Sequence, residues 1–138
     1  MAMTMEIDLV RMDVPASQKT ICSDVRKAQA SFFSSVITLE QARACCKRSK
    51  YLHFASYDSD VGLAKACAQA KCTLVVAVSD VLNLPPVEKG KKIARIKRFV
   101  ALCRHYFAEV KLASLARNEY ELRSAFEMKI VREYFGIA

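Results

Sequence analysis

The chain has 138 residues, 53% of them hydrophobic, and its 22 lysines and arginines against 14 aspartates and glutamates give a formal charge of +8. This length fits one domain that can bury a core, and the hydrophobic content excludes a disordered chain. No apolar run approaches the ~18 residues that span a bilayer, and the start "MAMTMEIDLV" lacks the basic segment of a signal peptide, so we expect a soluble cytoplasmic protein. The positive charge favours a polyanionic partner, although it could also serve solubility alone.

The elements predicted first are a strand over 4–12, a helix over 16–33, a strand over 34–39 and a helix over 40–50. The first strand alternates apolar and polar residues, whereas Ile21 and Val25 lie at helical spacing. Thr38 followed by Gln41 is a capping-box signature, which predicts where the second helix begins.

The elements predicted next are a strand over 51–57, a helix over 58–71, a strand over 72–82, a loop over 83–92 and a helix over 91–107. Asp58 is placed to cap the first of these helices, because a carboxylate accepts hydrogen bonds from free backbone N–H groups. The strand over 72–82 is continuously apolar, which is typical of a strand covered on both faces.

The chain closes with a strand over 108–116 and a helix. Asn118 and Glu121 have capping-box spacing at the start of that helix, and Gly136 is predicted to be its C-cap. Arg123 would then lie in the first turn, where the helix dipole disfavours a cation, so we expect it to hold a carboxylate or a phosphate. Five strand–helix units in series predict an α/β fold with a parallel sheet, either doubly wound or an incomplete barrel.

Residues with catalytic chemistry are sparse. The sequence contains no glycine-rich phosphate loop, which argues against dinucleotide-binding and P-loop folds. His53 lies inside a predicted strand and is interpreted as structural, with Leu52 and Phe54 on the opposite face. We expect most of the six cysteines to be buried, and the sequence leaves open whether any form a disulfide. A small metal-dependent hydrolase would have to use carboxylates at strand ends, namely Asp13, Asp58 and Asp80. A further alternative is a non-catalytic protein-interaction module, in which an open sheet edge left by missing strand–helix units pairs with a partner.

A basic segment is the stronger signal. No acidic residue occurs between Lys89 and Arg104, whereas a solvated helix face usually mixes both signs of charge. Cations concentrated on one helix are typical of a surface that contacts a nucleic-acid backbone. The predicted RNA-binding residues are Lys89, Lys91, Lys92, Arg95, Lys97, Arg98, Arg117 and Arg123.

The segment "KKIARIKRFVALCRHYFAEVKLASLARNEYELRSAFEMKIVREYFGI" resembles the C-terminal part of the ribonuclease P 30-kDa protein subunit family, called protein component 3 in archaea. The matching residues are Ser114, Ala116, Tyr120, Glu121, Leu122, Arg123, Gly136 and Ile137. "SDVLNLPP", "YLHFASYD" and "MEIDLVRMD" are similar to earlier parts of the family. The chain has Leu115 where the family often has glycine, and Ala125, Phe126 and Glu127 where it usually has Pro-Arg-Asp.

The resemblance implies a single shortened TIM-like domain over 1–138, related in fold to metal-dependent phosphoesterases. It also implies a protein subunit that is not catalytic alone. The RNA of ribonuclease P would remove the 5′ leader of precursor tRNA with Mg²⁺, and no cofactor would be bound by the protein. The implied partners are ribonuclease P RNA, precursor tRNA indirectly, and the ferredoxin-like protein component 2.

Overall fold

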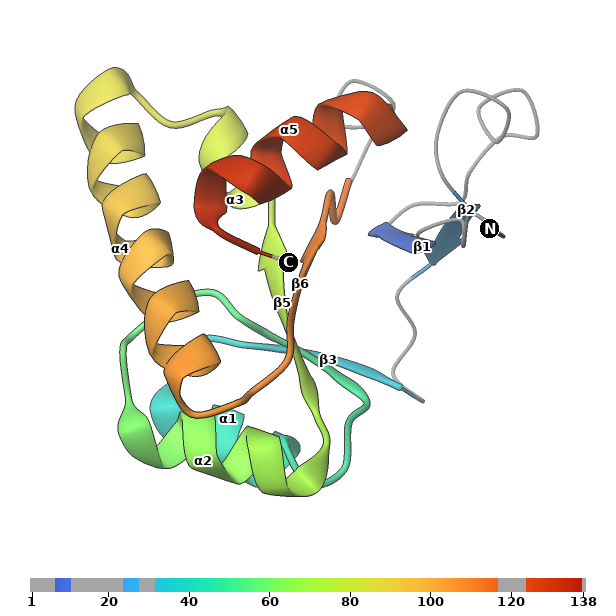
Figure 1. Cartoon of the computed structure of the whole chain (residues 1–138), viewed down its shortest axis with the longest axis vertical. Helices are drawn as coiled ribbons and strands as arrows, with labels where there is room; N and C mark the ends of the chain where they lie inside the picture. The colour runs from blue at the N-terminus through green and yellow to red at the C-terminus, as the bar shows by residue number, and fades with distance from the viewer. Residues whose placement is uncertain (1–6, 11–23, 28–31, 117–123, 138) are drawn as a thin grey trace.

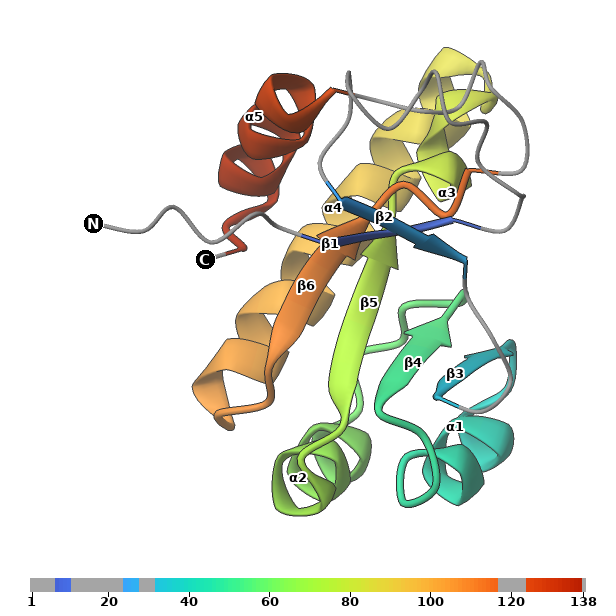
Figure 2. The ribbon, with the colours of Figure 1, turned by 90° about the vertical axis from the view of Figure 1, so that its right-hand side faces the viewer.

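The computed structural model describes residues 7–10, 24–27, 32–116 and 124–137, with side chains for 32–116, 124 and 126–137. Four parallel strands form one sheet in the order β3-β4-β5-β6, which Figure 2 shows strand by strand and Figure 1 shows from a second side. The strands are β3 (Phe33–Val36), β4 (Tyr51–Phe54), β5 (Thr73–Ala77) and β6 (Val110–Ala113). The helices are α1 (Leu39–Cys45), α2 (Val61–Ala70), α3 (Ser79–Leu82), α4 (Pro86–His105) and α5 (Ala125–Phe135). The predicted parallel α/β architecture is therefore confirmed.

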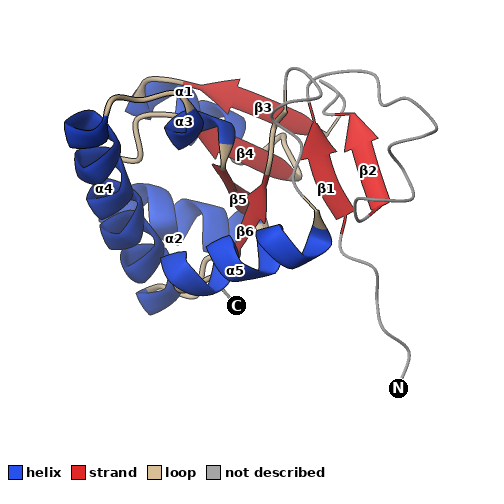
Figure 3. Cartoon of the chain, turned by 90° about the horizontal axis from the view of Figure 1, so that it is seen from above, coloured by secondary structure: helices blue, strands red, loops and turns tan. Residues whose placement is uncertain are grey.

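The main core lies between the sheet and the helices α1, α2, α4 and α5, which gather on one side of the sheet (Figure 3). Side chains on a strand alternate between its faces, so Leu52 and Phe54 enter this core while His53 points to the other face. The second face carries a smaller cluster that includes Val75 and Leu115. Helices on a single side of strands that follow chain order are compatible with an arc of a barrel.

The predicted helix over 16–33 is wrong in its described part. Residues 24–27 form strand β2 (Asp24–Lys27), which pairs in parallel with β1 (Ile7–Val10) in a separate two-stranded sheet (Figure 2). A spacing of four residues, as between Ile21 and Val25, is also an even spacing, so it satisfies the period of a strand as well as that of a helix. Pairing with β1 makes residues 24–27 a strand instead of a helix, because tertiary contacts override a weak local preference. The remainder of 16–33 up to residue 31 lies outside the described residues.

Two predicted boundaries around α3 and α4 also change. The apolar run over 72–82 is a strand only to Ala77, because the chain turns and Ser79–Leu82 forms the short helix α3. The predicted loop over 83–92 ends at Pro85, since α4 begins at Pro86, whose ring fixes a helical φ where no N–H is needed. Among the helices described, none is long and apolar enough to cross a membrane.

The caps explain where the other helices begin and end. The Thr38–Gln41 capping box of α1 and the Gly136 C-cap of α5, with φ 75°, are both confirmed. Asp60, rather than Asp58, caps α2 by accepting a hydrogen bond from the Leu63 N–H. The predicted Asn118–Glu121 capping box falls outside the described residues. The box that starts α5 is formed by Ser124 and Glu127, so the first turn of α5 begins after Arg123.

Candidate functional site

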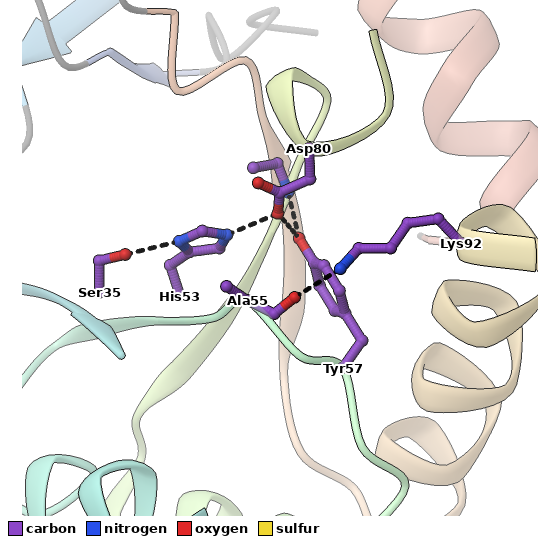
Figure 4. Close-up of polar contacts among 7 residues, drawn as sticks. Ser35, His53, Ala55, Tyr57, Asp80 and Lys92 are labelled. Carbon is purple, nitrogen blue, oxygen red and sulfur yellow. Dashed lines mark hydrogen bonds and ion pairs between the residues drawn. The ribbon is translucent and has the colours of Figure 1, made fainter. Parts of the chain in front are cut away.

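Polar side chains meet where the strands of the main sheet end. Ser35 and His53 lie directly opposite each other on β3 and β4, and Asp80 follows β5 on the short helix α3. The carboxyl ends of parallel strands share one edge of a sheet, so these residues come together although they are far apart in sequence. Figure 4 shows the resulting group of Ser35, His53, Tyr57 and Asp80, which we call the strand-end network.

The strand-end network is a chain of short hydrogen bonds. Ser35 Oγ lies 2.8 Å from His53 Nδ1, and His53 Nε2 lies 2.7 Å from Asp80 Oδ2. The Tyr57 hydroxyl donates to the same Asp80 oxygen at 2.6 Å and accepts the Ala77 N–H at 2.9 Å. His53 is only 2% exposed and Tyr57 is fully buried, so these bonds satisfy polar groups that are shielded from water.

Tyr57 is held in an unusual backbone conformation. Its φ of 50° lies in the left-handed region, which costs a residue other than glycine on the order of 1 kcal/mol. Its ring packs edge-on against Phe99 of α4, with centroids 5.5 Å apart. The contacts of the ring and of the hydroxyl offset the strain, and they place Tyr57 between the sheet and α4.

The environment of Asp80 contains opposing effects. Burial acts to raise the pKa of the carboxyl, while the hydrogen bond from His53 and its electrostatic attraction act to lower it. The Tyr57 hydroxyl and the Lys92 ammonium act in the same direction as His53. Together they outweigh burial, and the pKa of Asp80 lies below its ordinary value.

Acid is expected to destabilise the wild-type protein more steeply than an Asp80→Asn variant. Because the folded state has the lower pKa, ionised Asp80 contributes stability above the unfolded-chain pKa of about 4, and this is lost as the pH falls through the folded-state pKa. Urea unfolding at a series of pH values from about 7 to about 2.5 measures the difference. Glu133→Gln, which removes a carboxylate from an exposed site on α5, serves as the control and should follow the wild type. Parallel acid profiles for wild type and Asp80→Asn would contradict the assignment.

Lys92 of α4 is fixed beside this network. Its Nζ donates to the Ala55 carbonyl oxygen at 2.7 Å and lies 5.1 Å from the centroid of the Tyr57 ring (Figure 4). A cation over a tyrosine ring is attracted by the electron-rich face. The chain of contacts from His53 through Asp80 and Tyr57 therefore positions an ammonium group at the strand ends.

Arg95 lies one turn further along α4. Its Nη1 donates to the Ser56 carbonyl oxygen at 3.1 Å and to Asp58 Oδ1 at 3.2 Å. Both side chains of this ion pair are about half exposed, at 52% and 50%, so it contributes little to stability and mainly orients the guanidinium group.

These two cations open onto a cavity of about 430 Å³ at the strand ends. Its lining residues are Asp80, Leu84, Glu88, Lys91, Lys92 and Arg95. Ser35 and His53 are not among them, so the cavity meets the strand-end network only at the Asp80 carboxylate. A hydrogen-bonded Ser35–His53–Asp80 chain has the residue types of a catalytic triad, but this cavity does not reach its serine. We interpret the network as a positioning device.

Of the eight predicted RNA-binding residues, those that the structure describes do not all lie together on one surface. Lys91, Lys92 and Arg95 come together around the cavity. Lys97 instead reaches α5, where its Nζ lies 3.9 Å from the centroid of the Tyr134 ring. Lys89 is half-buried and Arg98 is exposed on α4. Arg117 and Arg123 lie outside the described residues, and RNA binding by the whole set remains a prediction.

The hydrolase alternative finds little support in the described part of the chain. Asp58 pairs with Arg95, and Asp80 belongs to the strand-end network. No group of three or more histidines, cysteines, aspartates or glutamates among the described residues is arranged to hold a metal ion. Asp13, the third carboxylate of that alternative, lies outside those residues.

The described cysteines are free thiols, and most are buried as expected. Four of them, Cys46, Cys67, Cys72 and Cys103, belong to the main core. Burial raises the pKa of the Cys103 thiol to about 12, which keeps it protonated and unreactive. Cys45 is half-buried, and Cys22 lies outside the described residues.

The sequence interpretation missed the strand-end network as a unit. It identified His53 and Asp80 separately, but it did not connect them with Tyr57 or Ser35. One signal was present, since Ser35, His53 and Asp80 all lie within strands that are predicted to be parallel. The predicted strands run past the observed ends, so the sequence did not show that these three residues share the carboxyl edge of the sheet. Comparison with known proteins adds no relative: neither a protein-family model nor a curated protein matches the chain.

Proposed function

We propose that the chain is an RNA-binding protein subunit of ribonuclease P, which supports RNA-catalysed removal of the 5′ leader from precursor tRNA. The observation that carries this proposal is the cationic outer surface of α4. Lys91, Arg95 and Arg98 are exposed there, on the side away from the buried Ile96 and Val100, and Lys97 is exposed at the flank facing α5. In the part of the chain that the structure describes, Arg95 alone of these cations has a carboxylate partner. Lys91 and Arg98 are left to neutralise phosphates, and Lys97 adds its charge from its place over the Tyr134 ring.

The fold supports the proposal at the level of architecture. Strands in chain order, with their helices on one side, fit a shortened TIM-like barrel of the kind that the family resemblance implies. In such barrels function lies at the carboxyl ends of the strands, which is where Lys91, Lys92 and Arg95 gather. In the proposed assembly the RNA performs catalysis with Mg²⁺, and the protein contributes binding.

A protein partner is part of the proposal. Phe126, Ile130 and Tyr134 lie four residues apart along α5 and are 72%, 51% and 58% exposed, so they form an apolar stripe on one face of the helix. Exposed apolar patches of this kind mark interaction sites. This stripe is a candidate contact for the ferredoxin-like ribonuclease P protein component 2.

Charge reversal on α4 tests the RNA contact. We expect Arg95→Glu/Arg98→Glu to reduce the affinity for ribonuclease P RNA and to lower the slope of log affinity against log salt by about 2, since each lost phosphate contact removes roughly one unit. Filter binding at several salt concentrations measures both quantities. The control is Lys47→Glu/Arg48→Glu, which makes the same charge change at exposed positions after α1.

The control separates a specific surface from net charge. Equal loss of affinity in both double variants would show that RNA binding depends on overall charge and not on α4. A precursor-tRNA cleavage assay reconstituted with and without the chain tests the subunit role. No stimulation of cleavage, together with salt-independent binding, would overturn the proposal.

A further inference from the structure

The strand-end cavity has a mixture of charges that the rest of α4 lacks. Two carboxylates, Asp80 and Glu88, line it together with the cations Lys91, Lys92 and Arg95. The three basic groups attract an anionic group to one side of the cavity, and the two carboxylates accept hydrogen bonds on the other side. The lining therefore fits a ligand that carries both an anionic group and hydrogen-bond donors.

The cationic side of the cavity has hydrogen-bond donors that the described contacts do not use. Both described contacts of Arg95 use Nη1, so the donors on Nη2 and Nε remain for a ligand. Lys92 is held in place by Ala55 and Tyr57, and Lys91 is exposed on the adjoining turn. An oriented guanidinium with two ammonium groups beside it is suited to a phosphate.

The acidic side of the cavity has hydrogen-bond acceptors that the described contacts do not use. His53 and Tyr57 both donate to Oδ2 of Asp80, so within the described residues Oδ1 is left to accept from a ligand. Glu88 is exposed in the first turn of α4 and adds a second carboxylate. Carboxylates accept hydrogen bonds from hydroxyl groups, and a ribose 2′-hydroxyl is the donor that distinguishes RNA from DNA.

The size of the cavity limits the ligand. A volume of about 430 Å³ lies near the lower end of the range for small-molecule sites, roughly 300–1,000 Å³, and corresponds to one nucleotide and not several. Leu84 supplies an apolar wall against which a ribose or a base can pack.

We propose that the strand-end cavity holds one ribonucleotide unit of the bound RNA, with its phosphate on Lys91, Lys92 and Arg95 and its 2′-hydroxyl on the carboxylates of Glu88 and Asp80. This inference rests on the proposed RNA-binding function and adds to it a means of preferring ribose over deoxyribose. The remaining cations of α4 then contact neighbouring phosphates of the same strand.

Two variants of the full-length chain separate the two sides of the cavity. The probes are a single-stranded RNA pentanucleotide of adenosines and its deoxy counterpart, titrated by calorimetry. Lys91→Ala is expected to weaken both by a similar factor. Glu88→Gln keeps an acceptor oxygen but removes its charge, so it is expected to weaken the binding of the RNA alone and to lower the RNA-to-DNA affinity ratio about fivefold, since a charge-assisted hydrogen bond is about twice as strong as a neutral one. The control Glu109→Gln, at an exposed position at the start of β6, should leave the ratio unchanged.

The following results would contradict the proposed ribonucleotide site. An unchanged ratio in Glu88→Gln, with RNA binding retained, removes the cavity from the RNA site and leaves the proposed function standing. Absence of RNA binding by the wild type would contradict both the ribonucleotide site and the proposed RNA-binding function. Adenosine 5′-monophosphate carries the same chemical groups, so it is titrated in parallel, and binding as tight as that of the pentanucleotide would assign the cavity to a free nucleotide. Both variants change exposed residues, and their unfolding curves confirm that they fold.

Discussion

An Asp80→Ala variant is expected to lose about 3 kcal/mol of unfolding free energy, because buried donors lose a charged acceptor. Asp80 Oδ2 accepts from His53 Nε2 and from the Tyr57 hydroxyl, and these two residues are 2% and 0% exposed. Alanine removes the oxygen that both share. Urea unfolding near neutral pH measures the loss, with Glu133→Ala at its exposed site as a control expected to remain close to wild type.

The companion variant Asp80→Asn separates charge from hydrogen bonding. Asparagine keeps an acceptor oxygen of the same shape but removes the negative charge, so we expect a loss intermediate between wild type and Asp80→Ala. If Asp80→Ala lay within about 0.5 kcal/mol of wild type, the range of ordinary surface substitutions, the strand-end network would have no role in stability.

The largest loss of stability is expected from Phe99→Ala, at about 3–5 kcal/mol, the range for deleting a buried aromatic ring. Phe99 is 2% exposed and its ring meets those of Tyr57 and Phe54, with centroids 5.5 and 6.4 Å away. The deletion leaves a cavity between α4 and the strand ends. The measurement is again urea unfolding, with the midpoint and the slope both recorded.

Phe107 provides a matched control for Phe99. Phe107→Ala removes the same ring from a position that is 90% exposed, so its expected cost is close to zero. Similar losses in the two variants would mean that Phe99 is not part of the core. A Phe99→Leu variant, which keeps most of the buried volume, is expected to fall between Phe99→Ala and wild type.

Local signals predicted much of the fold. The Thr38–Gln41 box and Gly136 are confirmed because capping depends on a few neighbouring residues. The error over 16–33 has a different origin, since the strand at 24–27 requires β1 as a partner, and pairing between distant segments is not encoded in local spacing. The closing helix begins at the Ser124–Glu127 box, and the similar spacing of Asn118 and Glu121 competed with it in the sequence.

The sequence predicted the basic residues of the candidate site, but it did not predict the hydrogen bonds that join the strand-end network. The absence of acids after Lys89 drew attention to α4, and three of the predicted cations do gather in one place, around the cavity. The role of Tyr57 could not be predicted from charge, because its position depends on a left-handed backbone conformation. Glycine is the usual sequence signal for that conformation, and position 57 is a tyrosine. Its contacts with Asp80 and Lys92 exist only once β4, α3 and α4 have assembled.

The order β3-β4-β5-β6 has a consequence for how the chain is assembled during synthesis. Each strand pairs with the one made just before it, so every new strand–helix unit meets an edge that already exists. No strand of this sheet has to wait for, or be inserted between, segments made later. A sheet built in this way can lose or gain a terminal unit without changing any existing pairing, because the change is confined to its last edge.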